Sequence, residues 1–210
     1  MQSSERAGPL PVYREGDCPL DPLLGATCAV VGYGNQGRAH ALNLRDSGLE
    51  VVVGARPGGA AATRAQADGF SPRSIADAFA SAELIALLTP DETHLDLLRT
   101  LHAMKLPRLR TLVFAHGFVL RFQSPPLDPS WDVCVVAPAG PGDLLRRRFE
   151  EGRGIPAIVA IAQDGSGRAS ARAKAYGAAL GSARAGMSSP RSHKRSRSIS
   201  SANKPCSAAG

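Results

Sequence analysis

The stretch Thr27-Cys28-Ala29-Val30-Val31-Gly32-Tyr33-Gly34-Asn35-Gln36-Gly37 decides the fold of this chain. Its first five residues form an apolar run typical of a buried strand, and the next six match the pattern G-x-G-x-x-G. A helical pattern then continues to Asp46, and a second apolar run occupies 50–53. Strand, glycine turn, helix and strand in this order predict a dinucleotide site, because the glycines let the backbone approach a pyrophosphate at a helix N-terminus.

The residue after the second apolar run indicates which cofactor is bound. An NAD site usually has an acidic residue at this point, which binds the ribose hydroxyls. Here Gly54 and Ala55 are followed by Arg56, whose guanidinium suits a 2′-phosphate. The sequence therefore predicts NADP(H) rather than NAD. The alternative for the glycine motif alone is an ordinary turn between a strand and a helix.

The composition is that of a globular protein in a reducing compartment. The chain has 210 residues, is 43% hydrophobic and carries a net charge of +7. Five basic residues and no acid lie from Met187 onward, so the rest carries only about +2 and does not favour nucleic acid as a partner. The four cysteines are scattered, and no apolar run reaches the length of a membrane span. We expect a cytoplasmic protein with no membrane partner.

Short apolar runs alternate with helical patterns along most of the chain. This alternation predicts an α/β fold, a Rossmann-type doubly wound parallel sheet covered by helices on both faces. The strands are expected at 27–31, 50–54, 84–88, 111–115, 132–137 and 156–161. The helices are expected near 36–47, 60–67, 74–81, 92–104, 142–151 and 167–180. We expect an N-terminal arm over 1–24, a nucleotide-binding domain over 25–186, and a disordered basic tail over 187–210 that is rich in serine and arginine.

Polar or glycine-rich loops follow the third, fourth and fifth expected strands. Ligands of open parallel sheets bind beyond the carboxyl ends of the strands, so these loops are expected to face the cofactor. They contain Thr89-Pro90-Asp91-Glu92-Thr93-His94, then His116-Gly117, and finally Pro138-Ala139-Gly140-Pro141-Gly142. Asp91 and Glu92 have a second interpretation, as acids that a helix dipole favours in the first turn.

Several of these motifs together resemble ketol-acid reductoisomerase, the enzyme also called acetohydroxy acid isomeroreductase. The resemblance rests on Gly32–Gly37 with the helix to Gly48, on Leu88-Thr89-Pro90-Asp91-Glu92, on Phe114-Ala115-His116-Gly117-Phe118, and on Val136-Ala137-Pro138 with Gly140-Pro141-Gly142. It covers about 25–186 in unbroken order. It implies an NADP(H)- and Mg2+-dependent oxidoreductase of valine and isoleucine biosynthesis. Such an enzyme converts acetohydroxy acids of the 2-acetolactate type to dihydroxy acids by alkyl migration and hydride transfer.

The resemblance also implies roles for particular residues. Gly32, Tyr33, Gly34, Asn35, Gln36 and Gly37 would hold the pyrophosphate, and Arg56 would hold the 2′-phosphate. Asp91, Glu92, Thr93 and His94 would flank the adenosine and ribose, Gly142 would line the site, and His116 is the candidate catalytic residue. No metal ligand is assigned, because the family's carboxylate ligands lie on a second, helical domain and no acid follows Gly186.

The chain departs from the family at two positions within the domain. After Arg56 the segment 57–62 offers no hydroxyl, so we expect a weakened preference for NADP over NAD. Ala139 stands where the family has a lysine, and a methyl group supplies no charge. We therefore expect this chain, which lacks the second domain, to bind NADP(H) but to turn over little or nothing.

The tail has two interpretations. Suitable codons for 189–210, read in a shifted frame, permit a peptide with D-L-F-G-E that resembles the family's next segment, so we expect an out-of-frame sequence. The alternative is a non-catalytic nucleotide-binding protein whose basic tail associates with RNA through phosphate contacts. The sequence leaves open whether the protein forms a homo-oligomer.

Overall fold

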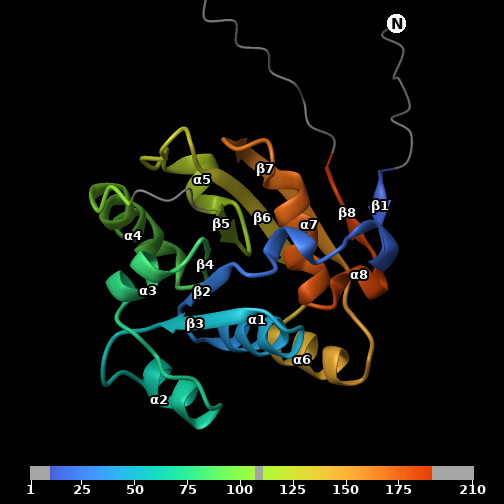
Figure 1. Ribbon diagram of the computed structural model, residues 1–210, viewed down its shortest axis with the longest axis horizontal. Helices are drawn as coiled ribbons and strands as arrows, with labels where there is room; N and C mark the ends of the chain where they lie inside the picture. The colour runs from blue at the N-terminus through green and yellow to red at the C-terminus, as the bar shows by residue number, and fades with distance from the viewer. Residues whose placement is uncertain (1–9, 107–110, 191–210) are drawn as a thin grey trace, which may run out of the picture.

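The computed structural model describes residues 10–106 and 111–190, which form one sheet with helices on its two faces (Figure 1). Within these residues the strand order is β1-β8-β7-β6-β5-β4-β2-β3. The strands are β1 (Val12–Tyr13), β2 (Thr27–Val31), β3 (Glu50–Gly54), β4 (Leu84–Leu87), β5 (Thr111–Phe114), β6 (Asp132–Pro138), β7 (Ala157–Asp164) and β8 (Met187–Ser188). The expected α/β class and Rossmann-type sheet are therefore confirmed.

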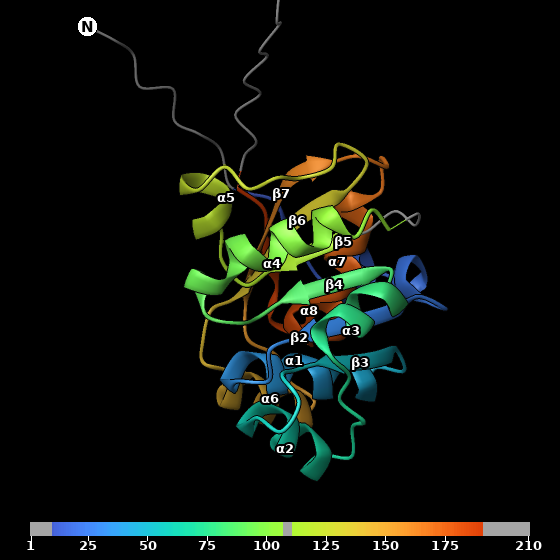
Figure 2. The same ribbon diagram turned by 90° about the vertical axis from the view of Figure 1, so that its left-hand side faces the viewer.

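Helices occupy most of the connections between the strands. They are α1 (Asn35–Asp46), α2 (Ala60–Ala67), α3 (Ile75–Ser81), α4 (Asp91–Ala103), α5 (Phe118–Phe122), α6 (Gly142–Glu150), α7 (Ala169–Ala179) and α8 (Ser182–Ala185), with 3-10 turns η1 (Glu15–Asp17) and η2 (Asp21–Leu23). Helices α1 and α7 pack on one face of the sheet, and α3 and α4 pack on the other (Figure 2). Within the described residues, no helix has the length and apolar character that crossing a membrane requires.

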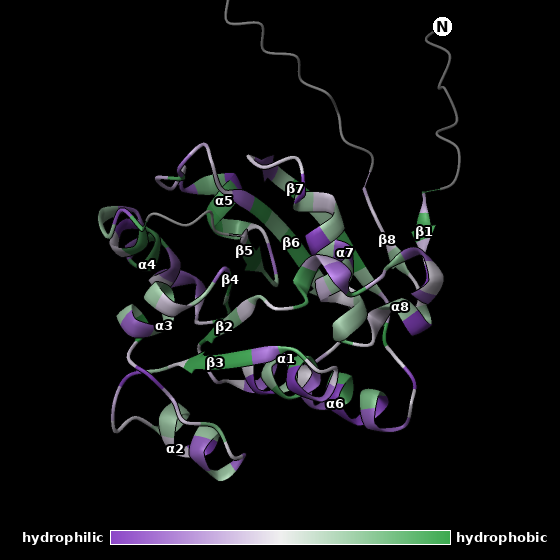
Figure 3. Ribbon diagram, in the orientation of Figure 1, coloured by the Kyte–Doolittle hydropathy of each residue, from purple (hydrophilic) through white to green (hydrophobic). Residues whose placement is uncertain are grey.

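The central strands are buried on both faces, which explains why their sequences are almost continuously apolar. In β2, Cys28 and Val30 belong to the core beneath α1 and α7, whereas Ala29 and Val31 belong to the core on the α3 and α4 side. Figure 3 shows the resulting concentration of hydrophobic residues on strands such as β3 and β6. Because the two cores share these strands, the carboxyl ends of β2 to β5 are held rigidly with respect to one another.

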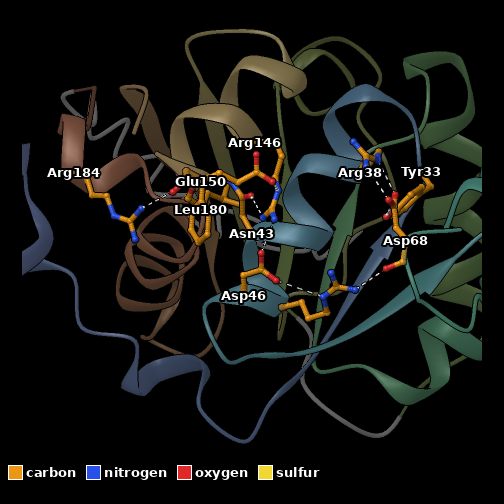
Figure 4. Close-up of polar contacts among 11 residues, drawn as sticks. Tyr33, Arg38, Asn43, Asp46, Asp68, Arg146, Glu150, Leu180 and Arg184 are labelled. Carbon is orange, nitrogen blue, oxygen red and sulfur yellow. Dashed lines mark hydrogen bonds and ion pairs between the residues drawn. The ribbon is translucent and has the colours of Figure 1, made fainter. Parts of the chain in front are cut away.

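The direction of β7 corrects the expectation of a fully parallel sheet. Strands β3, β2, β4, β5 and β6 are mutually parallel, but β7 runs antiparallel to β6, with a register shift between Val133 and Cys134. Helix α6 does not cross the sheet between these strands. It packs on α1, where Arg146 forms an ion pair with Asp46 at 2.7 Å and donates a hydrogen bond to Asn43 at 3.0 Å (Figure 4). Strand β7 therefore begins at the same end of the sheet at which β6 ends, and it runs in the opposite direction.

Two short strands lie outside the expected domain of 25–186. In the arm, β1 pairs antiparallel with β8, and Cys18 and Leu23 are buried. Strand β8 lies beyond the expected boundary at Gly186, and its Met187 is fully buried. Residues 191–210 lie outside the described residues, so the expected division into arm, domain and tail stays a prediction.

Candidate functional site

A pocket of about 470 Å³ lies where the carboxyl ends of β2, β3, β4 and β5 meet. The chain order places β3 on one side of β2 and β4 on the other, so the connections after β2 and β4 leave the sheet on opposite faces. Such a switch point is the usual ligand site of a doubly wound sheet. The pocket is lined by Gly32, Tyr33, Gly34, Asn35, Gln36, Gly54, Ala55, Arg56, Ala61, Ile75, Leu87, Leu88, Thr89, Pro90, Ala115 and His116.

The three motif glycines have different structural roles. Gly32 has φ +95°, and a Cβ there would lie 2.8 Å from the Leu88 carbonyl oxygen and the Thr89 amide nitrogen. A Cβ on Gly37 would collide with the carbonyl oxygen of Gly32, so glycine lets α1 start directly against the turn. A Cβ on Gly34 would meet no atom within 4 Å. Gly32 and Gly37 therefore shape the turn, and Gly34 leaves open space at the pocket.

The N-terminus of α1 presents its backbone to the pocket. Its N-cap is Gly34, which has no side chain to bind the first amides of the helix. Those amides lack partners within the helix and lie at the positive end of its dipole. A pyrophosphate fits this cradle, because it accepts hydrogen bonds and carries negative charge.

The side chains of Asn35 and Gln36 turn away from this cradle. Asn35 Oδ1 accepts a hydrogen bond from the Asp143 amide at 2.9 Å, and Gln36 Nε2 donates to the Gly140 carbonyl oxygen at 2.9 Å. A Cβ on Gly142 would collide with the Asn35 backbone, so this glycine lets α6 begin against α1. Asn35 and Gln36 therefore contribute backbone to the pocket, while their side chains fix the turn before α6.

The Tyr33 side chain also forms a contact with a distant segment of the chain. Its side chain is 1% exposed and donates a hydrogen bond to Asp68 at 2.9 Å (Figure 4). Arg38 binds the same carboxylate with two hydrogen bonds of 2.7 Å and holds the pKa of Asp68 below its usual value. Burial, followed by the bond to Asp68, raises the pKa of Tyr33. The ring thus anchors the glycine turn to the segment after α2.

Arg56 lies at the other end of the pocket and is exposed. Its guanidinium forms no hydrogen bond or ion pair with any of the described residues, and its carbonyl oxygen accepts from the Gly59 amide at 3.1 Å. The turn leads into α2, whose N-cap Gly59 also has no capping side chain. The Arg56 guanidinium and the N-terminus of α2 together can bind a phosphate.

Two titratable side chains, those of Asp91 and His94, lie next to His116 after the end of β5. Asp91 Oδ1 lies 3.0 Å from His116 Nε2 and 3.6 Å from His94 Nδ1. His94 is 2% exposed, and burial lowers its pKa, with the Asp91 carboxylate acting in the opposite sense. Its ring meets Phe114 edge-on at 5.6 Å and stacks on His116 at 6.1 Å. His116 itself is half exposed and lines the pocket.

The structure brings together only part of the predicted set of site residues. Seven of them line the pocket, namely Gly32, Tyr33, Gly34, Asn35, Gln36, Arg56 and His116. Six others are not part of this lining, namely Gly37, Asp91, Glu92, Thr93, His94 and Gly142. The Thr93 hydroxyl forms hydrogen bonds of 2.7 Å with the Thr89 hydroxyl and with the Pro90 carbonyl oxygen. Its side chain therefore stabilises the first turn of α4. Their roles in cofactor binding remain predictions.

Sequence reasoning missed several residues that line the pocket. Thr89 and Pro90 were recognised as a loop at a strand end, but the site residues were placed one turn later, in α4. Ala61 and Ile75 carry no recognisable signal, because small and aliphatic side chains at a helix start do not distinguish a pocket wall from core. In the described ranges 10–106 and 111–190, no group of three or more His, Cys, Asp or Glu side chains could hold a metal ion.

Comparison with known proteins agrees with this geometry. The family model described as the acetohydroxy acid isomeroreductase NADPH-binding domain matches residues 22–186. An NADH-preferring ketol-acid reductoisomerase from an uncultured archean is 32% identical, with a TM-score of 0.81 over 86% of this chain and 56% of its own. This chain thus spans little more than half the length of that relative.

More distant structures share the fold alone. A semialdehyde dehydrogenase NAD-binding protein from Cupriavidus necator is 16% identical, with a TM-score of 0.62 over 74% of this chain and 59% of its own. An imine reductase from Myxococcus stipitatus is 19% identical, with a TM-score of 0.55 over 78% of this chain and 54% of its own. The family match, in contrast, covers most of the chain and includes every residue that lines the pocket. The chain therefore belongs to the acetohydroxy acid isomeroreductase, or ketol-acid reductoisomerase, family and carries that family's NADPH-binding domain.

Proposed function

We propose that this chain binds a nicotinamide dinucleotide in the pocket at the ends of β2 to β5. The observation that carries the proposal is the open cradle at Gly34, where the uncapped amides of α1 share one pocket with Arg56, whose guanidinium has no partner within 10–106 and 111–190. The pyrophosphate would bind the amides, and the adenosine phosphate would extend toward Arg56. The nicotinamide would then lie toward Ala115 and His116.

Within this proposal the cofactor is NADP(H), with a modest preference over NAD(H). Arg56 supports binding of a 2′-phosphate, but the residues between it and α2 have no hydroxyl to add a second side-chain contact. The amides at the start of α2 and the Arg56 guanidinium would then distinguish NADP(H) from NAD(H). That the structural relative is described as NADH-preferring supports the expectation that cofactor preference in this fold is easily shifted.

The reaction proposed for the complete enzyme is that of ketol-acid reductoisomerase in branched-chain amino acid synthesis. A nicotinamide supplies the hydride that reduces the ketone formed after alkyl migration of an acetohydroxy acid. In this chain the pocket residues would orient the cofactor, and His116 would present an imidazole to the substrate beside the nicotinamide. His116 is therefore the candidate catalytic residue.

The described residues do not fit the magnesium site that the family resemblance implies. They contain no cluster of three or more candidate ligands, and Ala139 offers only a methyl group in the turn before α6. Oxygen ligands are what Mg2+ needs. We therefore propose that this chain binds dinucleotide with little or no isomeroreductase turnover of its own.

Titration of NADPH and NADH, followed by their fluorescence, tests the cofactor proposal. We expect saturable binding of both, with Arg56→Ala weakening NADPH by about tenfold and leaving NADH nearly unchanged, because one charge-assisted contact is lost. Arg64→Ala is the matched control, since this exposed arginine of α2 does not line the pocket. If wild-type protein binds neither nucleotide, the proposal is wrong.

An isomeroreduction assay with Mg2+ and 2-acetolactate tests the proposal that this chain has little or no turnover of its own. Binding without turnover is the expected result, whereas measurable turnover would show that the residues present suffice for the whole reaction. Salt-sensitive retention of RNA without nucleotide binding would favour the alternative of a basic RNA-associating tail, which falls outside the described residues.

A further inference from the structure

Helix α2 lies at the margin of the molecule, beyond β3, the last strand in the order of the sheet (Figures 1 and 2). Its buried side chains are those of Ala62 and Ala65, and a methyl group buries little apolar area. Packing on the body of the domain therefore contributes little to holding this helix in place. A polar contact at one end of α2 consequently matters more than it would on a helix of the core.

Asp68, the C-cap residue of α2, makes such a contact. Its carboxylate accepts two hydrogen bonds of 2.7 Å from Arg38 and one of 2.9 Å from the Tyr33 hydroxyl (Figure 4). The Asp68 carbonyl oxygen accepts a further hydrogen bond of 2.8 Å from Arg45. The Asp68 side chain is only 18% exposed, so its charge-assisted bonds are partly shielded from water. The glycine turn and α1 are therefore both fastened to one residue at the end of α2.

The opposite end of α2 carries the expected phosphate contact. The Arg56 carbonyl oxygen accepts from the Gly59 amide at 3.1 Å, and the Gly59 carbonyl oxygen accepts from the Thr63 amide at 3.1 Å. The turn of Arg56 thus continues directly into the first turn of the helix. The Ala55 amide is fixed by its bond of 3.0 Å to the Arg73 carbonyl oxygen, which makes this point a pivot. If the far end of α2 were released, the helix would turn about this pivot and redirect Arg56 and the first amides of α2.

The cradle at the start of α1 does not depend on Asp68. The Gly32 amide donates to the Gly54 carbonyl oxygen of β3 at 3.0 Å. The Gly34 carbonyl oxygen accepts from the Arg38 amide at 2.9 Å, within the first turn of α1. These backbone bonds fix the glycine turn whether or not α2 is held. A dinucleotide in the cradle would therefore keep its pyrophosphate contacts on loss of the Asp68 carboxylate, while the contacts from α2 would change.

We propose that Asp68 is a positioning residue that sets the preference for a 2′-phosphate, by holding α2 on α1 so that Arg56 and the first amides of α2 reach a dinucleotide in the cradle. This inference rests on the proposed function, because it requires a dinucleotide on α1 and a phosphate at Arg56. Asp68 does not line the pocket, so it acts through the position of α2 and not by touching the cofactor.

Titration of the Asp68→Asn protein with NADPH and NADH tests the inference. We expect NADPH binding to weaken by about threefold to tenfold and NADH binding by less than about twofold, because the charge-assisted bonds that hold α2 are lost. Asp68→Glu keeps a carboxylate and should retain part of the preference. In an Arg56→Ala background, Asp68→Asn should weaken NADPH binding less than it does in wild type, because its effect is transmitted largely through Arg56. Fully additive losses would contradict this route.

Asp46→Asn is the matched control, because its carboxylate pairs with Arg146 at 2.7 Å and joins α1 to α6 instead of α2. It should leave the ratio of the NADPH and NADH dissociation constants unchanged. Hydrogen exchange of the α2 amides, measured without nucleotide, should be about tenfold faster in Asp68→Asn and unchanged in Asp46→Asn. Tyr33→Phe removes one hydroxyl from the contact and keeps the ring, so it should shift the ratio in the same direction by a smaller factor.

Two outcomes would overturn the inference alone. One is an Asp68→Asn protein, or a Tyr33→Phe protein if the first does not fold, that is folded by circular dichroism and keeps the wild-type ratio of dissociation constants. The other is an equal loss of affinity for both nucleotides, which would show a general effect on the pocket. If wild-type protein binds neither nucleotide, the proposed function is wrong and the inference is wrong with it, a result that the wild-type titration distinguishes from the other two.

Discussion

At the scale of single residues, two glycines of the same motif are expected to respond differently to the same substitution. Gly37→Ala puts a methyl group onto the Gly32 carbonyl oxygen, so it should destabilise the protein by about 1–3 kcal/mol. Gly34→Ala puts the methyl group into open space at the pocket, at an ordinary φ of −82°. It should leave stability nearly unchanged and weaken nucleotide binding.

Thermal unfolding and NADPH titration of both variants check this prediction. The Gly34→Ala protein is the informative one, because it should separate binding from folding. If it binds NADPH as wild type does, the phosphate does not occupy the cradle at the start of α1.

His40 gives a pH dependence of stability at the same scale. It is fully buried between α1 and α7, its Nδ1 lies 2.9 Å from the Tyr176 hydroxyl, and burial lowers its pKa to about 3. The unfolded chain binds the proton near pH 6.5, so the unfolded state gains protons first as the pH falls. The stabilising contribution is complete above pH 6.5 and is lost progressively between pH 6.5 and about 3.

Urea unfolding between pH 8 and 4 measures this effect. We expect the free energy of unfolding to fall below pH 6.5 with a slope of up to about 1.4 kcal/mol per pH unit from this residue. His40→Gln should lower overall stability and flatten that slope. The exposed His102 is the control, and His102→Gln should keep the wild-type slope.

At the scale of elements, helix α3 shows how a short sequence signal sets a boundary. Ser74 accepts a hydrogen bond from the Asp77 amide at 3.1 Å and donates to its carboxylate at 2.7 Å, so its side chain caps the first turn of the helix. Ser74→Ala should cost about 1 kcal/mol of unfolding free energy in urea denaturation. Ser81→Ala at the other end of α3 should cost much less, and equal losses would contradict a capping role.

Elements that depend on local sequence were predictable, and those that depend on distant partners were not. The glycine turn, β2 and β3 follow from periodicity and backbone requirements within 27–54, so the structure reproduces them. Strands β1 and β8 have two residues each and exist because β8 pairs with β7 and β1 pairs with β8, so no local pattern indicates them. The direction of β7 depends on the packing of α6 against α1. The apolar sequence of β7 gives no indication of that packing.

The candidate site divides in the same way. Backbone positions at strand ends, such as Gly34 and Arg56, follow from the order of strands and turns. Side-chain directions do not, because Tyr33 is drawn away by Asp68 and Asn35 by the Asp143 amide, both distant in sequence. The contact between Asp91, at the start of α4, and His116, after β5, likewise joins two segments that only the sheet brings together.

At the scale of the whole molecule, the two faces of β7 differ in cover. Val159 is 3% exposed in the core with Ala173 and Tyr176 of α7, whereas the neighbouring Ile158 is 51% exposed on the opposite face. Phe118 and Phe122 of α5 are exposed as well. The buried core on that face reaches Val133 of β6, and among the described residues it includes none of β7. Such exposed apolar surface is expected to bind hydrophobic dyes and to promote association.

Substitution of the two neighbouring residues of β7 tests this asymmetry directly. Ile158→Thr should reduce the fluorescence of a bound hydrophobic dye and change the unfolding free energy by less than about 0.5 kcal/mol, because its side chain is already in water. Val159→Thr should instead cost about 1–3 kcal/mol, because it buries a hydroxyl beneath α7. Light scattering of the Ile158→Thr protein should show less association than wild type. A large loss of stability in Ile158→Thr would mean that this face is covered in solution, and the sheet would then be packed on both sides as far as its edge.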